Sequence, residues 1–209
     1  MSHYAKSSTK DFEVLKNNIP QIVDEVNKYL EKRRLLEAAC WGLNEDIKIV
    51  DLFSSSADSQ LTMDVTKEFQ SVWTKAIRKV LSKYLKNNNF KEGDHYDIML
   101  DNEEYEIKTT SAYKNKEWSG NKFSINKVGK HILIKYKIGD FSIEELGIYV
   151  IDLNCCTNTK WIPGSSKGTS FSVLKIHIDD INCVQSLIGD FIKEKNSRVW
   201  GTPKLKKVL

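Results

Sequence analysis

The sequence has no apolar run long enough to cross a bilayer, and its first residues, MSHYAKSSTKDFEVL, lack the apolar stretch of a signal peptide. We therefore expect a soluble, cytoplasmic protein that does not bind membranes. Cysteine is also scarce. The four cysteines show no C-x-x-C pair and no histidine at a zinc-binding spacing, so we expect reduced thiols rather than disulfides or a zinc site.

Acidic residues are nearly absent from the segment 111–137, where Glu117 is the only one among seven lysines. The C-terminal residues 193–209 are also basic, whereas acids gather between residues 92 and 106. An acidic cluster with basic flanks is typical of a site where metal ions meet a polyanion. A lysine-rich segment alone is equally well explained as a solvated loop.

The composition is that of a folded chain. With 209 residues and 40% apolar content, we expect one domain that buries a sizeable core. We divide this single domain, 1–209, into a helical N-terminal segment (1–45) for dimerisation or for packing behind a sheet, a core (64–195) and a basic tail (196–209).

Apolar spacings of three and four predict helices over 10–40 and 64–85. Pro20 is expected to divide the first or to start its second piece. Asp64 is the expected N-cap of the second, whose apolar stripe runs to Tyr84. A closing helix is predicted over 179–195.

Period-two alternation predicts strands over 96–100, 104–110, 131–138, 146–153 and 171–178, while 111–130 and 158–171 are expected to be polar loops. This order of elements predicts an α/β (α+β) fold with a mixed sheet of about five strands flanked by helices.

The first two strands form a hairpin, YDIMLDNEEYEIKTT (96–110). Glu106 and Lys108 share one face of their strand because side chains alternate. A two-residue turn at Asn102 and Glu103 would place Asp97 opposite Lys108 and Met99 opposite Glu106, with the apolar residues on the other side. A change of one residue in the loop would turn Asp97 away.

Two carboxylates and an ammonium on one face suit phosphate chemistry. Mg²⁺ prefers a few carboxylate oxygens and leaves positions for water and phosphate. It activates bound water and neutralises charge developing on the phosphate, while a lysine orients the water or offsets that charge. The alternative is a solvated polar face with a cross-strand Lys–Asp pair.

A long predicted helix is followed by Asp97, a short hairpin and Glu106-Ile107-Lys108. This arrangement resembles the PD-(D/E)xK nuclease superfamily and, within it, type II restriction endonucleases. The resemblance implies a restriction-endonuclease-like core, with Asp97 and Glu106 as metal ligands and Lys108 as the catalytic lysine. It also offers Glu68, on the helix before the hairpin, as a third metal ligand. Tyr96 stands where the family often has proline, which leaves Asp94 as a substitute for Asp97.

The resemblance further implies Mg²⁺-dependent hydrolysis of double-stranded DNA by a homodimer at a short palindromic site, leaving 5′-phosphates. Two alternatives remain, a structure-selective or repair nuclease of the same superfamily and a non-enzymatic nucleic-acid-binding module. Candidate DNA contacts follow the hairpin, where ammonium groups suit phosphates and carboxamides suit adenine edges. They are Lys114, Lys116, Asn121, Lys122, Asn126 and Lys127.

Overall fold

The computed structural model describes residues 10–42, 48–49, 59–85, 96–111, 117–121, 129–155, 161–163, 172–177 and 183–192. The helices are α1 (Lys10–Asn17), α2 (Ile19–Trp41) and α4 (Ser59–Leu81). The strands are β1 (Ile98–Leu100), β2 (Glu103–Thr110), β3 (Glu117–Asn121), β4 (Lys130–Ile138), β5 (Ile143–Asp152), β6 (Trp161–Pro163), β7 (Ser172–His177) and β8 (Val184–Ile192). Among these helices, none has the length and apolar character needed to span a membrane.

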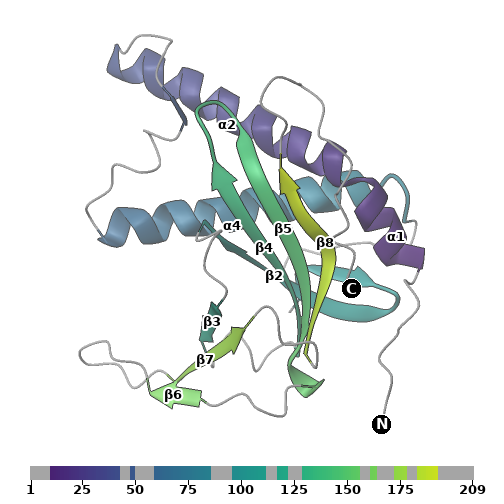
Figure 1. Ribbon diagram of the computed structural model, residues 1–209. Coiled ribbons are helices and arrows are strands. Elements are labelled where there is room, and N and C mark those ends of the chain that lie inside the picture. Colours follow the sequence, from purple (N-terminus) through teal and green to yellow (C-terminus); the bar gives the residue numbers. More distant parts are fainter. Residues whose placement is uncertain are drawn as a thin grey trace.

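The main sheet contains five strands in the order β1-β2-β4-β5-β8. β2 and β4 are parallel, and the other neighbouring pairs are antiparallel. Helices α2 and α4 lie across these strands (Figure 1). The expected α+β class, with a mixed five-stranded sheet and flanking helices, is confirmed.

A second, three-stranded sheet, β3-β7-β6, has no strand paired with the first and lies near the lower end of the molecule in Figure 1. The prediction of loops at 117–121 and 161–163 was wrong. Neither stretch alternates apolar and polar residues over enough length to signal a strand. Both are held by antiparallel pairing with β7, which is distant from β3 in sequence.

The predicted division of the first helix is confirmed. α1 ends at Asn17, and α2 begins at Ile19 with Pro20 in its first turn, where a missing N–H costs nothing. Two details of the next helix were wrong. Because α4 begins at Ser59, Asp64 lies inside the helix and is not its N-cap. Because α4 ends at Leu81, Tyr84 lies beyond the helix, and it is 48% exposed.

The predicted closing helix was also wrong, because residues 184–192 form strand β8, paired with β5. Val184 and Leu187 are both buried, and their spacing of three imitates a helix. Irregularities in the β5–β8 register interrupt the regular alternation of a strand. Gly189, within the segment, disfavours the helical alternative.

The two faces of the main sheet pack differently. On one face, residues such as Ile107, Ile132 and Tyr136 join the helices in a single apolar core, where Phe69 of α4 stacks on Tyr136 with ring centroids 5.3 Å apart. On the other face, Leu133, Tyr149 and Ile151 pack with Ile176 of β7. The second sheet therefore contacts the face opposite the helices.

Candidate active site

The hairpin that carries the candidate residues turns at Asp101 and Asn102. Both have positive φ, 53° and 62°, as a type I′ turn requires, and Asp and Asn tolerate this region. Leu100 pairs with Glu103 and Met99 with Glu104. The predicted turn at Asn102–Glu103 was therefore wrong by one residue, and the cross-strand pairs derived from it were wrong as well.

That error preserves the predicted faces, because moving the turn by one residue shifts each cross-strand partner by two. Tyr105 and Ile107 point into the helix-side core and are buried. Glu106 and Lys108 lie on the opposite face and are half-buried, with side chains 17% and 19% exposed. The apolar residues Tyr105 and Ile107 therefore lie on the face opposite Glu106 and Lys108, as the sequence indicated.

Asp97 reaches the Glu106–Lys108 segment in a way that the sequence did not predict. It lies in a bend just before β1, and its backbone N–H donates to the Tyr105 carbonyl at 2.9 Å. Its carboxylate Oδ2 accepts the backbone N–H of Ile107 at 2.8 Å. Asp97 is therefore not the cross-strand partner of Lys108. Its carboxylate instead lies beside Ile107, the residue between Glu106 and Lys108.

Arg78 of α4 explains this departure from the ladder. In a regular hairpin, the Ile107 N–H would donate to the Tyr96 carbonyl. The Arg78 guanidinium instead donates to the carbonyls of Asp97 (2.7 Å) and Tyr96 (3.4 Å). The chain before β1 is thereby held toward α4, and the Asp97 side chain serves as acceptor for Ile107. Sequence reasoning missed Arg78 because a helical arginine carries no signal of such a contact.

Glu106 has two charged or titratable neighbours. Its Oε1 forms an ion pair with Lys108 Nζ, and its Oε2 lies 3.7 Å from Nε2 of His131. Parallel pairing places His131 beside Glu106 in the next strand. Burial, and after it the charge of Lys108, lower the pKa of His131 to about 4, so its imidazole is neutral near pH 7. A histidine within a strand carries no sequence signal of such a contact.

Helix α1 holds the turn of the hairpin. The Asp11 carboxylate accepts the backbone N–H of Asp101 at 2.8 Å, and the ring of Phe12 meets that of Tyr105 edge to face at 5.5 Å. α1 thus packs against the hairpin, and the expected role of the N-terminal segment in dimerisation stays a prediction.

The structure does not bring Glu68 to the hairpin residues, and its role as a metal ligand stays a prediction. Its carboxylate accepts the hydroxyl of Tyr29 and lies 3.8 Å from Arg33, both on α2. Glu68 is ten residues before Arg78 in α4, about 15 Å along the helix axis. Moreover, α4 packs on the sheet face opposite Glu106 and Lys108.

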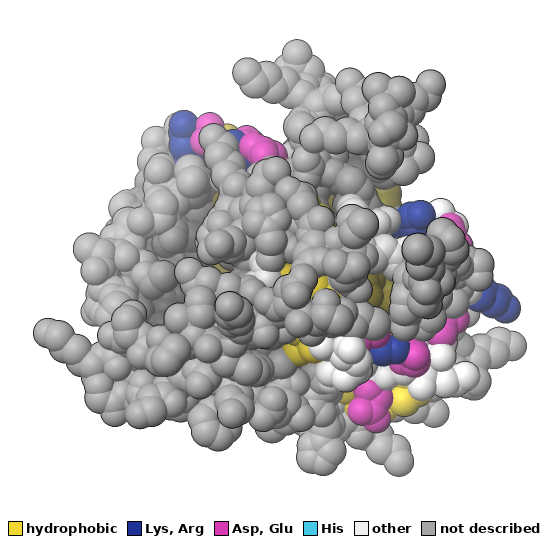
Figure 2. Space-filling model, turned by 60° about the horizontal axis from the view of Figure 1, so that its bottom comes forward, with side chains coloured by type: hydrophobic (Ala, Val, Ile, Leu, Met, Phe, Trp, Pro, Cys, Tyr) yellow, Lys and Arg dark blue, Asp and Glu magenta, His cyan; other side chains and the backbone are white. Residues whose placement is uncertain are grey.

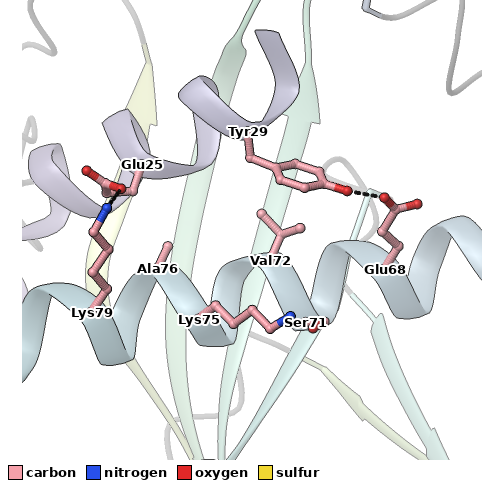
Figure 3. Close-up of a pocket in the computed structure, with 8 residues that line it drawn as sticks. All are labelled: Glu25, Tyr29, Glu68, Ser71, Val72, Lys75, Ala76 and Lys79. Atoms are coloured by element: carbon pink, nitrogen blue, oxygen red, sulfur yellow. Dashed lines mark hydrogen bonds and ion pairs between the residues drawn. The ribbon is translucent and has the colours of Figure 1, made fainter. Parts of the chain in front are cut away.

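Glu68 instead lines a groove of about 280 Å³ between α2 and α4. Figure 3 shows the Tyr29–Glu68 hydrogen bond near one end of this groove and the Lys79–Glu25 ion pair near the other. Burial and the hydrogen bond to Glu68 raise the pKa of Tyr29 to about 12. The groove is separate from the candidate active site, because it lies on the helical layer.

Most of the predicted DNA contacts lie outside the described residues, namely Lys114, Lys116, Lys122, Asn126 and Lys127, as does Asp94. Asn121 ends β3, and only its backbone is described. Among the side chains coloured in Figure 2, most acidic groups lie close to basic ones. The expected DNA contacts therefore remain a prediction.

The residues present fit a hard divalent cation. Oε2 of Glu106 is buried and accepts no hydrogen bond from the described residues, and the Asp97 carboxylate is fixed beside the same strand segment. Within the described ranges, no three His, Cys, Asp or Glu side chains already form a metal-binding group. Two carboxylates plus solvent are nevertheless a common ligand set for Mg²⁺, which keeps several waters.

Comparison with known proteins gives no match: no family model, no curated protein and no solved structure is significantly similar to this chain.

Proposed function

We propose that the chain is a Mg²⁺-dependent endodeoxyribonuclease with a restriction-endonuclease-like core, acting as a type II enzyme on double-stranded DNA. The observation that carries the proposal is the Asp97–Ile107 hydrogen bond of 2.8 Å. It brings one carboxylate to the strand segment whose neighbouring side chains, Glu106 and Lys108, supply the second carboxylate and the ammonium.

Each residue has a role in this proposal. Asp97 and Glu106 would hold Mg²⁺, which when bound supplies charge neutralisation for the phosphate and acidifies water. Lys108 lies on the same face as Glu106 and would orient the attacking water or offset phosphoryl charge. Adding water across the P–O3′ bond gives 5′-phosphate and 3′-hydroxyl ends. A homodimer would match a two-fold symmetric recognition site.

The test incubates the full chain with plasmid and mixed-sequence DNA, with Mg²⁺ or with EDTA. Discrete fragments that require Mg²⁺ are expected from the wild type. Glu106→Gln and Lys108→Ala are each expected to lower the rate by at least about 100-fold. Lys137→Ala is the matched control, because Lys137 lies in β4, is exposed, and pairs with Glu144 and Glu145 away from the hairpin.

Three other outcomes would contradict parts of this proposal. Cleavage that survives both hairpin substitutions would exclude these residues as the site. Degradation without discrete fragments, lost in both variants, would favour a structure-selective or repair nuclease. Mg²⁺-independent DNA binding without cleavage would favour a non-enzymatic binding module.

A further inference from the structure

Glu106, a proposed metal ligand, lies beside a histidine of the neighbouring strand. Glu106 of β2 and His131 of β4 are parallel register partners, so their side chains leave the same face at the same level of the sheet. His131 is fully buried, and its Nε2 lies 3.7 Å from Oε2 of Glu106. The pair is thus fixed by the central strands rather than by a loop.

The separation between these two atoms is too long for a hydrogen bond. It is within about 1 Å of the spacing between adjacent ligands of an octahedral ion such as Mg²⁺ or Mn²⁺, because ligand atoms about 2.1 Å from such an ion are about 3.0 Å apart. A shift of the Glu106 carboxylate by that amount would let both atoms bind one ion. A neutral imidazole nitrogen and a carboxylate oxygen are both ligand atoms for divalent transition ions.

We propose that His131 Nε2 is a metal ligand, which binds a divalent ion together with Oε2 of Glu106. This inference rests on the proposed function, since it concerns the same metal site. It adds a nitrogen donor to a ligand set that would otherwise consist of oxygen alone.

The added nitrogen has a consequence for which ion is preferred. Mg²⁺ favours oxygen ligands, whereas imidazole is a ligand for first-row transition ions, of which Mn²⁺ is the weakest binder and the nearest to Mg²⁺ in its preference for oxygen. The site is therefore expected to bind Mn²⁺ more tightly than Mg²⁺, and this margin is expected to depend on His131.

The direct test uses Mn²⁺ as the probe and pulsed electron paramagnetic resonance on the full chain without DNA. A coordinated imidazole is expected to give a ¹⁴N modulation of the Mn²⁺ signal, which changes to the ¹⁵N pattern when the histidines carry ¹⁵N. This measurement requires no substitution, so it does not depend on a variant folding.

Substitutions then assign the nitrogen to one residue. His131→Gln is expected to remove the nitrogen signal and to weaken Mn²⁺ binding by at least about tenfold, with a smaller effect on Mg²⁺ measured by calorimetry. His95→Gln and His177→Gln are the matched controls, and both are expected to retain the signal. Circular dichroism of each variant reports whether the fold is retained.

The outcomes separate this inference from the proposed function. Mn²⁺ that binds through Asp97 and Glu106 without any nitrogen signal would overturn the role of His131 and leave the nuclease proposal intact. A nitrogen signal that His95→Gln abolishes and His131→Gln does not would also overturn it. A chain in which Asp97→Asn and Glu106→Gln leave Mn²⁺ binding unchanged would contradict both proposals.

Discussion

The Asp97 carboxylate accepts a hydrogen bond from the backbone N–H of Ile107, with 2.8 Å between Oδ2 and N. This contact gives Asp97 two separable properties. Its oxygen completes the backbone pairing of the hairpin, and its negative charge would hold a metal ion. Different substitutions remove one property or both.

Asp97→Asn is expected to keep the acceptor for Ile107 but to remove the charge. Cleavage should therefore fall by at least about 100-fold while stability changes little. Asp97→Ala should also destabilise the fold, by about 1–3 kcal/mol, because the Ile107 N–H loses its partner. Urea unfolding and initial cleavage rates of both variants check this. Equal stability of the two variants would contradict the structural role.

The turn offers a test of the hairpin register. Asn102 is exposed, with φ 62°, so its side chain makes little contribution to packing. Asn102→Val is expected to cost about 1–2 kcal/mol, because a β-branched residue is strained in the left-handed region. Asn102→Gly should be tolerated. Thermal or urea unfolding measures both.

Glu104→Val is the matched control for this turn, because Glu104 is exposed within the extended strand β2, where valine is well accommodated. If valine were equally tolerated at 102 and 104, the turn would not lie at Asp101 and Asn102.

Glu68→Gln tests whether Glu68 only contacts α2, as in the structure, or binds the metal, as the family resemblance implies. Because the Glu68 carboxylate contacts Tyr29 and Arg33 of α2, its neutralisation is expected to leave the cleavage rate unchanged and to lower stability slightly. Plasmid cleavage rates, compared with those of Glu106→Gln, provide the measurement. A loss as large as that of Glu106→Gln would mean that α4 contributes its glutamate to the site after all.

Tyr29 predicts a pH dependence of stability at alkaline pH. Its pKa is raised from 10.0 to about 12, first by burial and then by its hydrogen bond to Glu68. A group whose pKa is higher in the folded state adds stability that is complete below pH 10.0 and is lost as the pH rises through about 12.

The free energy of unfolding of Tyr29→Phe is therefore expected to approach that of the wild type as the pH rises through this window. Urea titrations at several pH values compare the two proteins. A difference between them that stays constant across the window would contradict a raised pKa at Tyr29.

The sequence by itself determined the division of the first helix and the positions of five strands. Pro20 divided the first helix, and period-two alternation located β1, β2, β4, β5 and β7. Because side chains repeat every two residues along a strand, Glu106 and Lys108 were placed on one face even though the predicted turn was displaced by one residue.

Tertiary structure alone decided how the remaining groups meet. Arg78 draws the chain before β1 toward α4, and this contact gives the Asp97 carboxylate its place at Ile107. Parallel pairing of β2 with β4 brings His131 beside Glu106, 25 residues away in sequence. Packing of α4 against α2 keeps Glu68 from the site. Such contacts depend on which elements become neighbours, and local periodicity carries no information about that choice.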